Sequence, residues 1–202
     1  MYRTVVAYLV VLATVAGCGS RAPDVRDGDI IFQTSRSAQS LAVQQATHSR
    51  YSHMGIIISR DGHPNVFEAS AKVKYTPLQA WIARGLNGVY VVKRLSSGLT
   101  AEQVERLRVA SRSFEGLPYD STFEWTDQRM YCSELVWKLY DRALGMHIGE
   151  PQHLRDFDLS SPAVRIKMQE RYKGNIPLDE TVISPAAMFE STALKTVASN
   201  GT

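Results

Sequence analysis

The two cysteines set the first constraint on how this chain can fold. Cys18 ends a leader-like stretch at the N-terminus, and Cys132 lies far away in the second half of the 202 residues. Once Cys18 is removed or modified, Cys132 has no partner for an internal disulfide. The fold must then be held by packing, and a chain of this length with 44% hydrophobic residues can bury the core of one domain.

The N-terminus has the pattern of a signal peptide, which we predict over residues 1–17. Arg3 supplies a positive charge, and Thr4 to Ala16 form an uncharged apolar run that is shorter than the ~20 residues a membrane span needs. Val15-Ala16-Gly17-Cys18 resembles a bacterial lipobox, which implies cleavage before Cys18 and its lipidation. Residues 18–26 would then be the lipidated cysteine and a tether.

This pattern predicts a lipid-anchored protein of the bacterial cell envelope, bound to the membrane through Cys18. Gly19 after that cysteine fits the periplasmic side of the outer membrane, if the organism has one. An ordinary secretory signal with an incidental cysteine is the alternative.

The net charge and the spacing of possible metal ligands limit which binding partners we expect. The net charge of +3 is small and forms no basic stripe, so we expect no nucleic-acid partner. No His-Glu-x-x-His or similar pattern occurs, so we expect neither a metal nor a cofactor. The oligomeric state stays open.

The body of the chain predicts a single α+β domain over residues 27–190, followed by a flexible tail over residues 191–202. Short apolar runs predict strands, and apolar residues at helical spacing predict helices. Strands are expected near residues 30–32, 54–58, 66–67 and 89–92, and helices near residues 35–49, 78–82, 101–114, 132–144 and 185–189. We expect an antiparallel sheet of about four to six strands.

Cys132 is the candidate nucleophile because it opens a predicted amphipathic helix. Unpaired N–H groups at a helix start stabilise a thiolate and can also bind an oxyanion. Burial as a small hydrophobic residue is the alternative.

His53 is the best placed of the five histidines to act as the base. It precedes the most strand-like segment, and a turn at Asp61-Gly62 would place Glu68 opposite Gly55, diagonally beside His53. Glu68 could then orient the imidazole. A one-residue slip would instead leave Glu68 as an exposed strand carboxylate.

Several motifs together resemble the permuted papain-like amidases of the YaeF/YiiX type, within the wider NlpC-like group of cysteine peptidases. The motifs are Asp27-Gly28-Asp29-Ile30-Ile31, Ser52-His53-Met54-Gly55-Ile56, Phe67-Glu68-Ala69, Gly116-Leu117-Pro118-Tyr119-Asp120 and Tyr131-Cys132-Ser133-Glu134-Leu135-Val136. The resemblance implies a circularly permuted papain-like fold in which the sheet packs against the helix of Cys132. It also implies that Cys132 is the nucleophile, His53 the base and Glu68 the orienting residue.

Three neighbouring residues are candidates for substrate binding. Tyr119 and Tyr131 could line the cleft, although an aromatic residue beside a core helix is more often packing. Asp120 could bind an amine of the substrate or simply close a turn.

The leading functional hypothesis is a cysteine amidase or peptidase that cleaves an amide or isopeptide bond through a thioester, with peptidoglycan peptides of the envelope as the expected substrate. A lipid acyl hydrolase or acyltransferase similar to lecithin retinol acyltransferase is the second hypothesis, and it would need an apolar tunnel. A non-catalytic envelope-binding lipoprotein with Cys132 buried in its core is the third.

Overall fold

The computed structural model describes residues 23–201. The expected signal peptide, the lipidated Cys18 and most of the tether lie outside the described residues.

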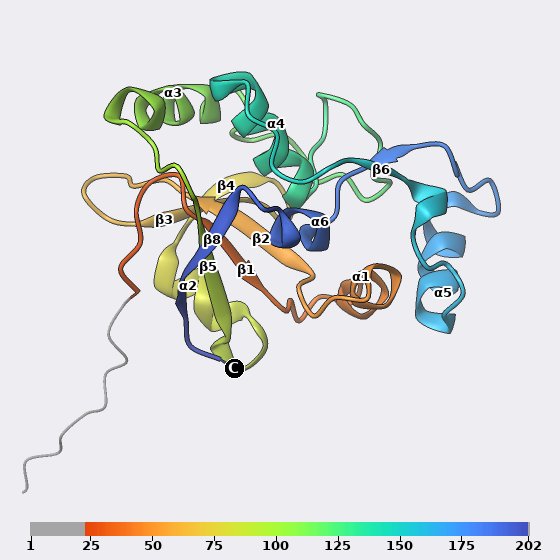
Figure 1. The fold of residues 1–202 in the computed structure, drawn as a ribbon. Coiled ribbons are helices and arrows are strands. Elements are labelled where there is room, and N and C mark those ends of the chain that lie inside the picture. Colours follow the sequence, from red (N-terminus) through yellow and green to blue (C-terminus); the bar gives the residue numbers. More distant parts are fainter. Residues whose placement is uncertain (1–22, 202) are drawn as a thin grey trace, which may run out of the picture.

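A six-stranded antiparallel sheet forms the centre of the molecule (Figure 1). Its strands run in the order β4-β3-β2-β1-β5-β8, and every neighbouring pair is antiparallel. The strands are β1 (Ile30–Gln33), β2 (His53–Ile57), β3 (Asn65–Ala69), β4 (Val73–Pro77), β5 (Tyr90–Leu95) and β8 (Leu194–Ser199). The α+β class and the antiparallel sheet predicted from the sequence are therefore confirmed.

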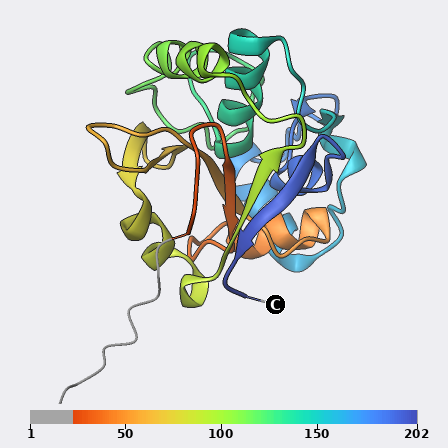
Figure 2. The same ribbon diagram turned by 60° about the vertical axis from the view of Figure 1, so that its left-hand side comes forward.

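Helices and a small second sheet surround the central sheet (Figures 1 and 2). The helices are α1 (Ser40–Thr47), α2 (Leu78–Arg84), η1 (Leu86–Gly88), α3 (Ala101–Ser111), α4 (Cys132–Leu144), η2 (Leu154–Asp156), α5 (Pro162–Tyr172) and α6 (Pro185–Glu190). The second sheet pairs β6 (Gln152–His153) with β7 (Thr181–Val182). Within residues 23–201, no helix combines the length and apolarity needed to cross a membrane.

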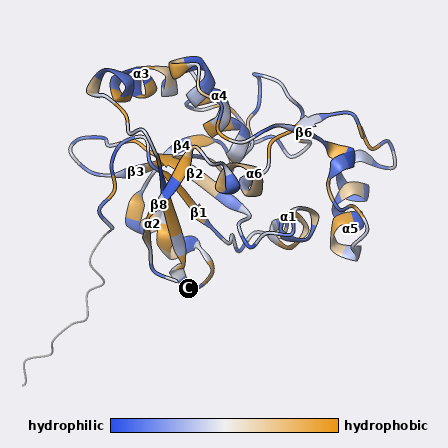
Figure 3. Cartoon of the chain, viewed as in Figure 1, coloured by the Kyte–Doolittle hydropathy of each residue, from blue (hydrophilic) through white to orange (hydrophobic). Residues whose placement is uncertain are grey.

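The sheet is buried on both faces, because successive side chains of a strand point to opposite sides. In β1, Ile30 and Phe32 join the larger core cluster, which contains the apolar face of α4, whereas Ile31 joins a smaller cluster with Trp81 of α2. The central strands are accordingly mainly hydrophobic, with polar residues such as Gln33 and His53 at strand ends (Figure 3). The sheet thus separates the helix of Cys132 from α2.

The hairpin between β2 and β3 has the turn predicted from the sequence. Asp61 and Gly62 have φ angles of 51° and 77°, the left-handed values that a two-residue hairpin turn requires. Ile56 pairs with Phe67, which continues to Gly55 opposite Glu68. A Cβ atom on Gly55 would lie 2.8 Å from the carbonyl oxygen of Phe67, so the close approach of these strands needs glycine.

The prediction of a flexible tail over residues 191–202 is wrong. Residues Leu194–Ser199 form β8, which pairs with β5 at the edge of the sheet, and Leu194 is buried in the core. The sequence after Ser191 has no strong apolar alternation, because β8 is an edge strand whose other residues are largely exposed. Its pairing partner, rather than its own pattern, makes it a strand.

We expect Leu194→Ala to lower the free energy of unfolding by about 2–4 kcal/mol, because it removes a buried side chain from the core. Lys195→Ala is the matched control on the same strand, where the side chain is exposed, and should change stability by less than about 0.5 kcal/mol. Urea unfolding followed by circular dichroism measures both. Equal, negligible effects would mean that this strand does not contribute to the folded core.

Candidate active site

Cys132 is the first residue of α4, and its side chain is only 6% exposed. The preceding residue, Tyr131, has an extended backbone, so the helix begins sharply and the N–H groups of its first turn are without carbonyl partners in the helix. Leu135, Val136 and Leu139 on the same face are fully buried. Packing of this face therefore fixes the sulfur at a positive helix end, as the sequence predicts.

His53 is the first residue of β2 and links the sheet to α4. Its Nε2 lies 2.7 Å from Oε2 of Glu68, and the ring also hydrogen-bonds the thiol of Cys132. Because an imidazole has two nitrogens, Nδ1 is left for the sulfur. The ring stacks on Trp81 with 5.8 Å between centroids, which holds its plane.

Glu68 is fully buried, and its carboxylate is surrounded by donors. Besides His53, it accepts hydrogen bonds from Oγ1 of Thr76 at 2.6 Å, Nε1 of Trp81 at 3.0 Å and Nη2 of Arg84 at 2.7 Å. A buried carboxylate is stable in ionised form only with such compensation. The hydrogen-bond chain from Glu68 to His53 to Cys132 is therefore anchored at its inner end.

These contacts shift the protonation of His53 and Glu68 in opposite directions. Burial alone would lower the pKa of His53, but hydrogen bonds with Cys132 and Glu68 outweigh it and raise that pKa from 6.5 to about 9. Burial alone would raise the pKa of Glu68, but the bond and charge of His53, with Thr76 and Arg84, lower it to about 2. At neutral pH the site thus holds an imidazolium between a carboxylate and the sulfur.

Tyr119 and Tyr131 both line the pocket at Cys132, and their hydroxyl groups bind different partners. The Tyr119 hydroxyl accepts a hydrogen bond from Nε2 of Gln39 at 2.6 Å, and the pKa of Tyr119 is raised by burial and by the nearby Cys132. Tyr131 is buried, and its hydroxyl accepts a hydrogen bond from the backbone N–H of Ile183.

Asp120 is fully buried and closes a turn. Its Oδ1 accepts hydrogen bonds from the backbone and hydroxyl of Thr122, both at 2.8 Å. Asp120 lines neither the pocket at Cys132 nor the cleft at His53. Of the two roles considered from the sequence, the structure shows the turn.

The sequence did not reveal the residues that position Glu68 and Tyr119 through hydrogen bonds. Thr76 lies in β4, and its hydroxyl donates a hydrogen bond to Glu68. Arg171 of α5 donates to Oε1 of Gln39 at 2.6 Å, which fixes the amide that binds Tyr119. Only the fold brings residues 39, 119 and 171 together, so no local spacing signals this chain of contacts.

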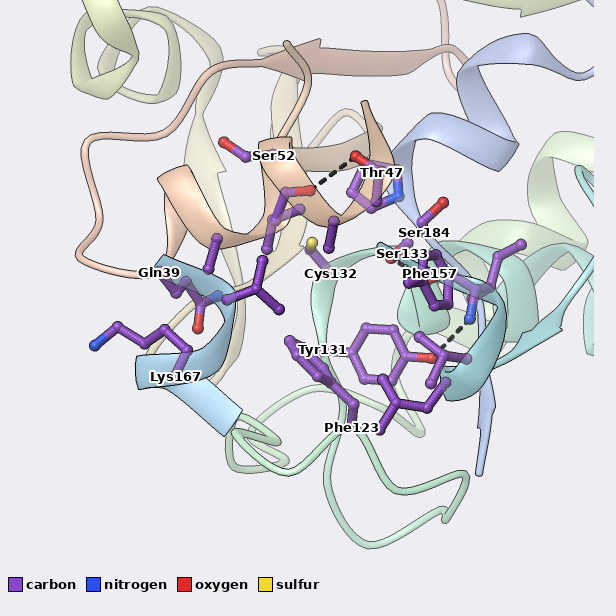
Figure 4. Close-up of a pocket in the computed structure, with 18 of the residues that line it drawn as sticks. Gln39, Thr47, Ser52, Phe123, Tyr131, Cys132, Ser133, Phe157, Lys167 and Ser184 are labelled. Carbon is purple, nitrogen blue, oxygen red and sulfur yellow. Dashed lines mark hydrogen bonds between the residues drawn. The ribbon is translucent and has the colours of Figure 1, made fainter. Parts of the chain in front are cut away.

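An apolar pocket of about 70 Å³ opens at the sulfur of Cys132. Figure 4 shows the sulfur facing its interior, between side chains of α1 and the rings of Tyr131 and Phe123. The other apolar residues that line it are Ala42, Val43, Ala46, Leu154, Phe157, Leu159, Val164, Met168, Val182, Ile183 and Pro185. The sequence did not reveal this pocket, because its walls come from five separate segments.

Comparisons with known proteins identify the family to which the chain belongs. The family described as "Permuted papain-like amidase enzyme, YaeF/YiiX, C92 family" matches residues 24–198. The uncharacterized protein YiiX of Escherichia coli strain K12 is 52% identical over 190 residues, which cover 94% of each chain. A crystal structure of metalloprotein YiiX from Escherichia coli O157:H7 has a TM-score of 0.85 and 55% identity, and the match covers 87% of this chain and 97% of that one.

We expect His53 to hold its proton in the folded protein well above pH 6.5. Its contribution to the free energy of unfolding is then complete below pH 6.5, where the unfolded chain also binds the proton, and disappears as the pH rises through about 9. Titration of the ring signals by NMR measures the folded pKa directly.

Glu68→Gln should lower that pKa, because it removes the negative charge and hydrogen bond that hold the proton, and should cost about 2–4 kcal/mol of stability. Glu115→Gln removes an exposed carboxylate paired with Arg60 and is the matched control. A His53 titration that is the same in both variants would contradict the assigned contact.

Proposed function

Because the chain belongs to the family of permuted papain-like amidases of the YaeF/YiiX type, we propose that it is a cysteine hydrolase with Cys132 as nucleophile. His53 exchanges protons with the reacting groups. Glu68 orients the imidazole and stabilises its protonated form. The hydrogen-bond chain from buried Glu68 through His53 to Cys132 at the start of α4 carries this proposal. A cysteine buried only for packing would need no such chain.

The reaction proceeds by acyl transfer in two stages. The Cys132 thiolate attacks the substrate carbonyl, the bond to the leaving amine breaks, and His53 gives its proton to that amine, which leaves a thioester. Neutral His53 then accepts a proton from an attacking water, the carbon–sulfur bond breaks, and the acid product leaves. The thiolate and the imidazolium are thereby restored.

Two kinds of hydrogen-bond donor can stabilise the oxyanion that forms in each stage. The backbone N–H groups at the start of α4 point toward the sulfur end of the helix. Tyr119 accepts its hydrogen bond from Gln39, so its own O–H is free to donate, and burial keeps this hydroxyl protonated. We therefore assign Tyr119 to the oxyanion.

The apolar pocket favours a substrate with an apolar acyl group. The acyl carbon bonds to Cys132, so the rest of the acyl group must extend from the sulfur, and the space there has mainly hydrophobic walls. Lys167 and Arg171 also line the pocket, but most of its walls offer no partner to the charged groups of peptidoglycan stem peptides. We propose hydrolysis of an amide, or the related ester, of an apolar acyl group in preference to peptidoglycan cleavage.

A bound metal does not fit the residues of this site, although the relative with a crystal structure is described as a metalloprotein. Within residues 23–201, no three His, Cys, Asp or Glu side chains are grouped as ligands. Glu68 also accepts bonds from an arginine and an indole, which leave its oxygens no free direction for a cation. The proposed steps use the protein's own groups.

We propose that the enzyme acts at the cell envelope. This rests on the leader-like residues 1–17 and the lipobox-like cysteine, Cys18, and it would keep the site near acylated substrates. Detection of a lipid-modified Cys18 by mass spectrometry tests it.

We expect iodoacetamide at pH 6 to alkylate Cys132 rapidly in the native protein, because His53 hydrogen-bonds its sulfur and the sulfur lies at the start of α4. His53→Ala should slow this reaction by roughly tenfold or more. His63→Ala is the control, because His63 lies in the exposed hairpin turn. Labelling only after denaturation would favour the non-catalytic hypothesis.

The length of the acyl group is a second test. Ala46→Phe places a ring in the pocket and should reduce kcat/KM for a dodecanoyl amide by roughly tenfold, with little effect on an acetyl amide. Leu41→Phe adds a ring to the exposed side of the same helix and should affect neither. Equal losses on both substrates would contradict an acyl pocket.

A further inference from the structure

A second cleft, of about 410 Å³, lies on the other side of the catalytic pair. His53 lines this cleft and Cys132 does not, whereas Cys132 lines the apolar pocket and His53 does not. Gln39 and Tyr119 line both and form the boundary between them. The two catalytic side chains thus face two different spaces.

If the proposed function holds, each of the two spaces receives a different part of the substrate. The acyl group becomes bonded to the sulfur and stays on the Cys132 side. The leaving group receives its proton from His53, so its nitrogen must approach the imidazole and depart on that side. The cleft at His53 is therefore the space for the leaving group.

The lining of this cleft is cationic and contains no carboxylate. The residues are Gln33, Ser35, Arg36, Ser37, Gln39, His53, Ala69, Ser70, Arg84 and Tyr119. Arg84 binds Glu68 through Nη2 alone among the described residues, and its side chain is 43% exposed. Arg36 is exposed and forms no ion pair within residues 23–201. Guanidinium groups with unused donors favour a carboxylate or a phosphate.

The groove on the far side of the apolar pocket has the opposite character. It shares Ala46, Thr47, Phe157 and Ser184 with the pocket, but four carboxylates line it. These belong to Glu150, Asp156, Asp158 and Glu190. An anionic group would be repelled there and attracted at Arg36, so the charge of the molecule orients such a substrate in one direction across the site.

We propose that the cleft at His53 is a specificity site for an anionic leaving group, with Arg36 as its principal contact. The substrate class is then an amide that joins an apolar acyl group to an amine bearing a carboxylate or a phosphate. Arg84 adds positive charge to the cleft but also positions Glu68, so its mutation would affect catalysis as well as binding. Arg36 has no such contact, so its mutation tests specificity alone.

Three dodecanoyl amides with different leaving groups test this on the full-length protein in detergent. N-dodecanoylglycine carries a carboxylate, N-dodecanoylphosphoethanolamine carries a phosphate, and N-dodecanoylethanolamine is neutral. Released dodecanoate is measured by mass spectrometry. We expect a higher kcat/KM for at least one anionic substrate than for the neutral one, and the better of the two identifies the anion. The preference should shrink as salt is added.

Arg36→Gln should remove this preference, with a rise in KM of about fivefold for the preferred anion and little change in kcat or in the neutral substrate. Arg112→Gln is the matched control, because Arg112 is equally exposed but lines a different pocket. Equal rates on all three substrates, or an Arg36→Gln loss of the same size on each, would overturn the proposal. Absence of hydrolysis and of any acylated Cys132 would instead refute the proposed function on which it rests.

Discussion

The buried charge of Glu68 is the constraint on which the site depends. A fully buried carboxylate must be compensated, and the compensation comes from three elements that the sequence separates: β2 with His53, β4 with Thr76, and α2 with Trp81 and Arg84. Satisfying this one group fixes how α2 lies on the sheet and where the ring of His53 points. The catalytic geometry is therefore a consequence of the charge balance inside the protein.

The sheet and α4 bring the two halves of the reaction together. Helix α4 packs on β2 and β3. This packing places Cys132, the first residue of α4, beside His53, the first residue of β2. The sulfur faces the apolar pocket and His53 faces the cationic cleft, so in the proposed reaction the two products would leave into different spaces. Tyr119, held by Gln39 and Arg171, stands at the boundary where the oxyanion would form.

Much of the candidate site could be read from local pattern. The helix start at Cys132, the strand at His53 and the Asp61-Gly62 turn are short-range features, and the turn fixed the register that sets Glu68 beside His53. The lipobox-like Cys18 is also local, but it lies outside the described residues. The edge strand β8 was missed because its residues become a strand only through pairing with β5.

Local patterns and the family resemblance of the motifs were enough to predict the α+β class, the catalytic candidates and their order along the chain, because strands, helix starts and tight turns depend on residues close in sequence. The chemistry of the spaces around these residues became visible only in the folded structure. The pocket walls come from α1, the loop before α4, the residues in and after η2, α5 and the segment before α6, and the cationic cleft joins Arg36 to Arg84. Such surfaces arise from long-range packing, which no local spacing encodes, so the sequence led to the hypothesis of peptidoglycan peptides and the folded pocket led to our proposal of an apolar acyl group.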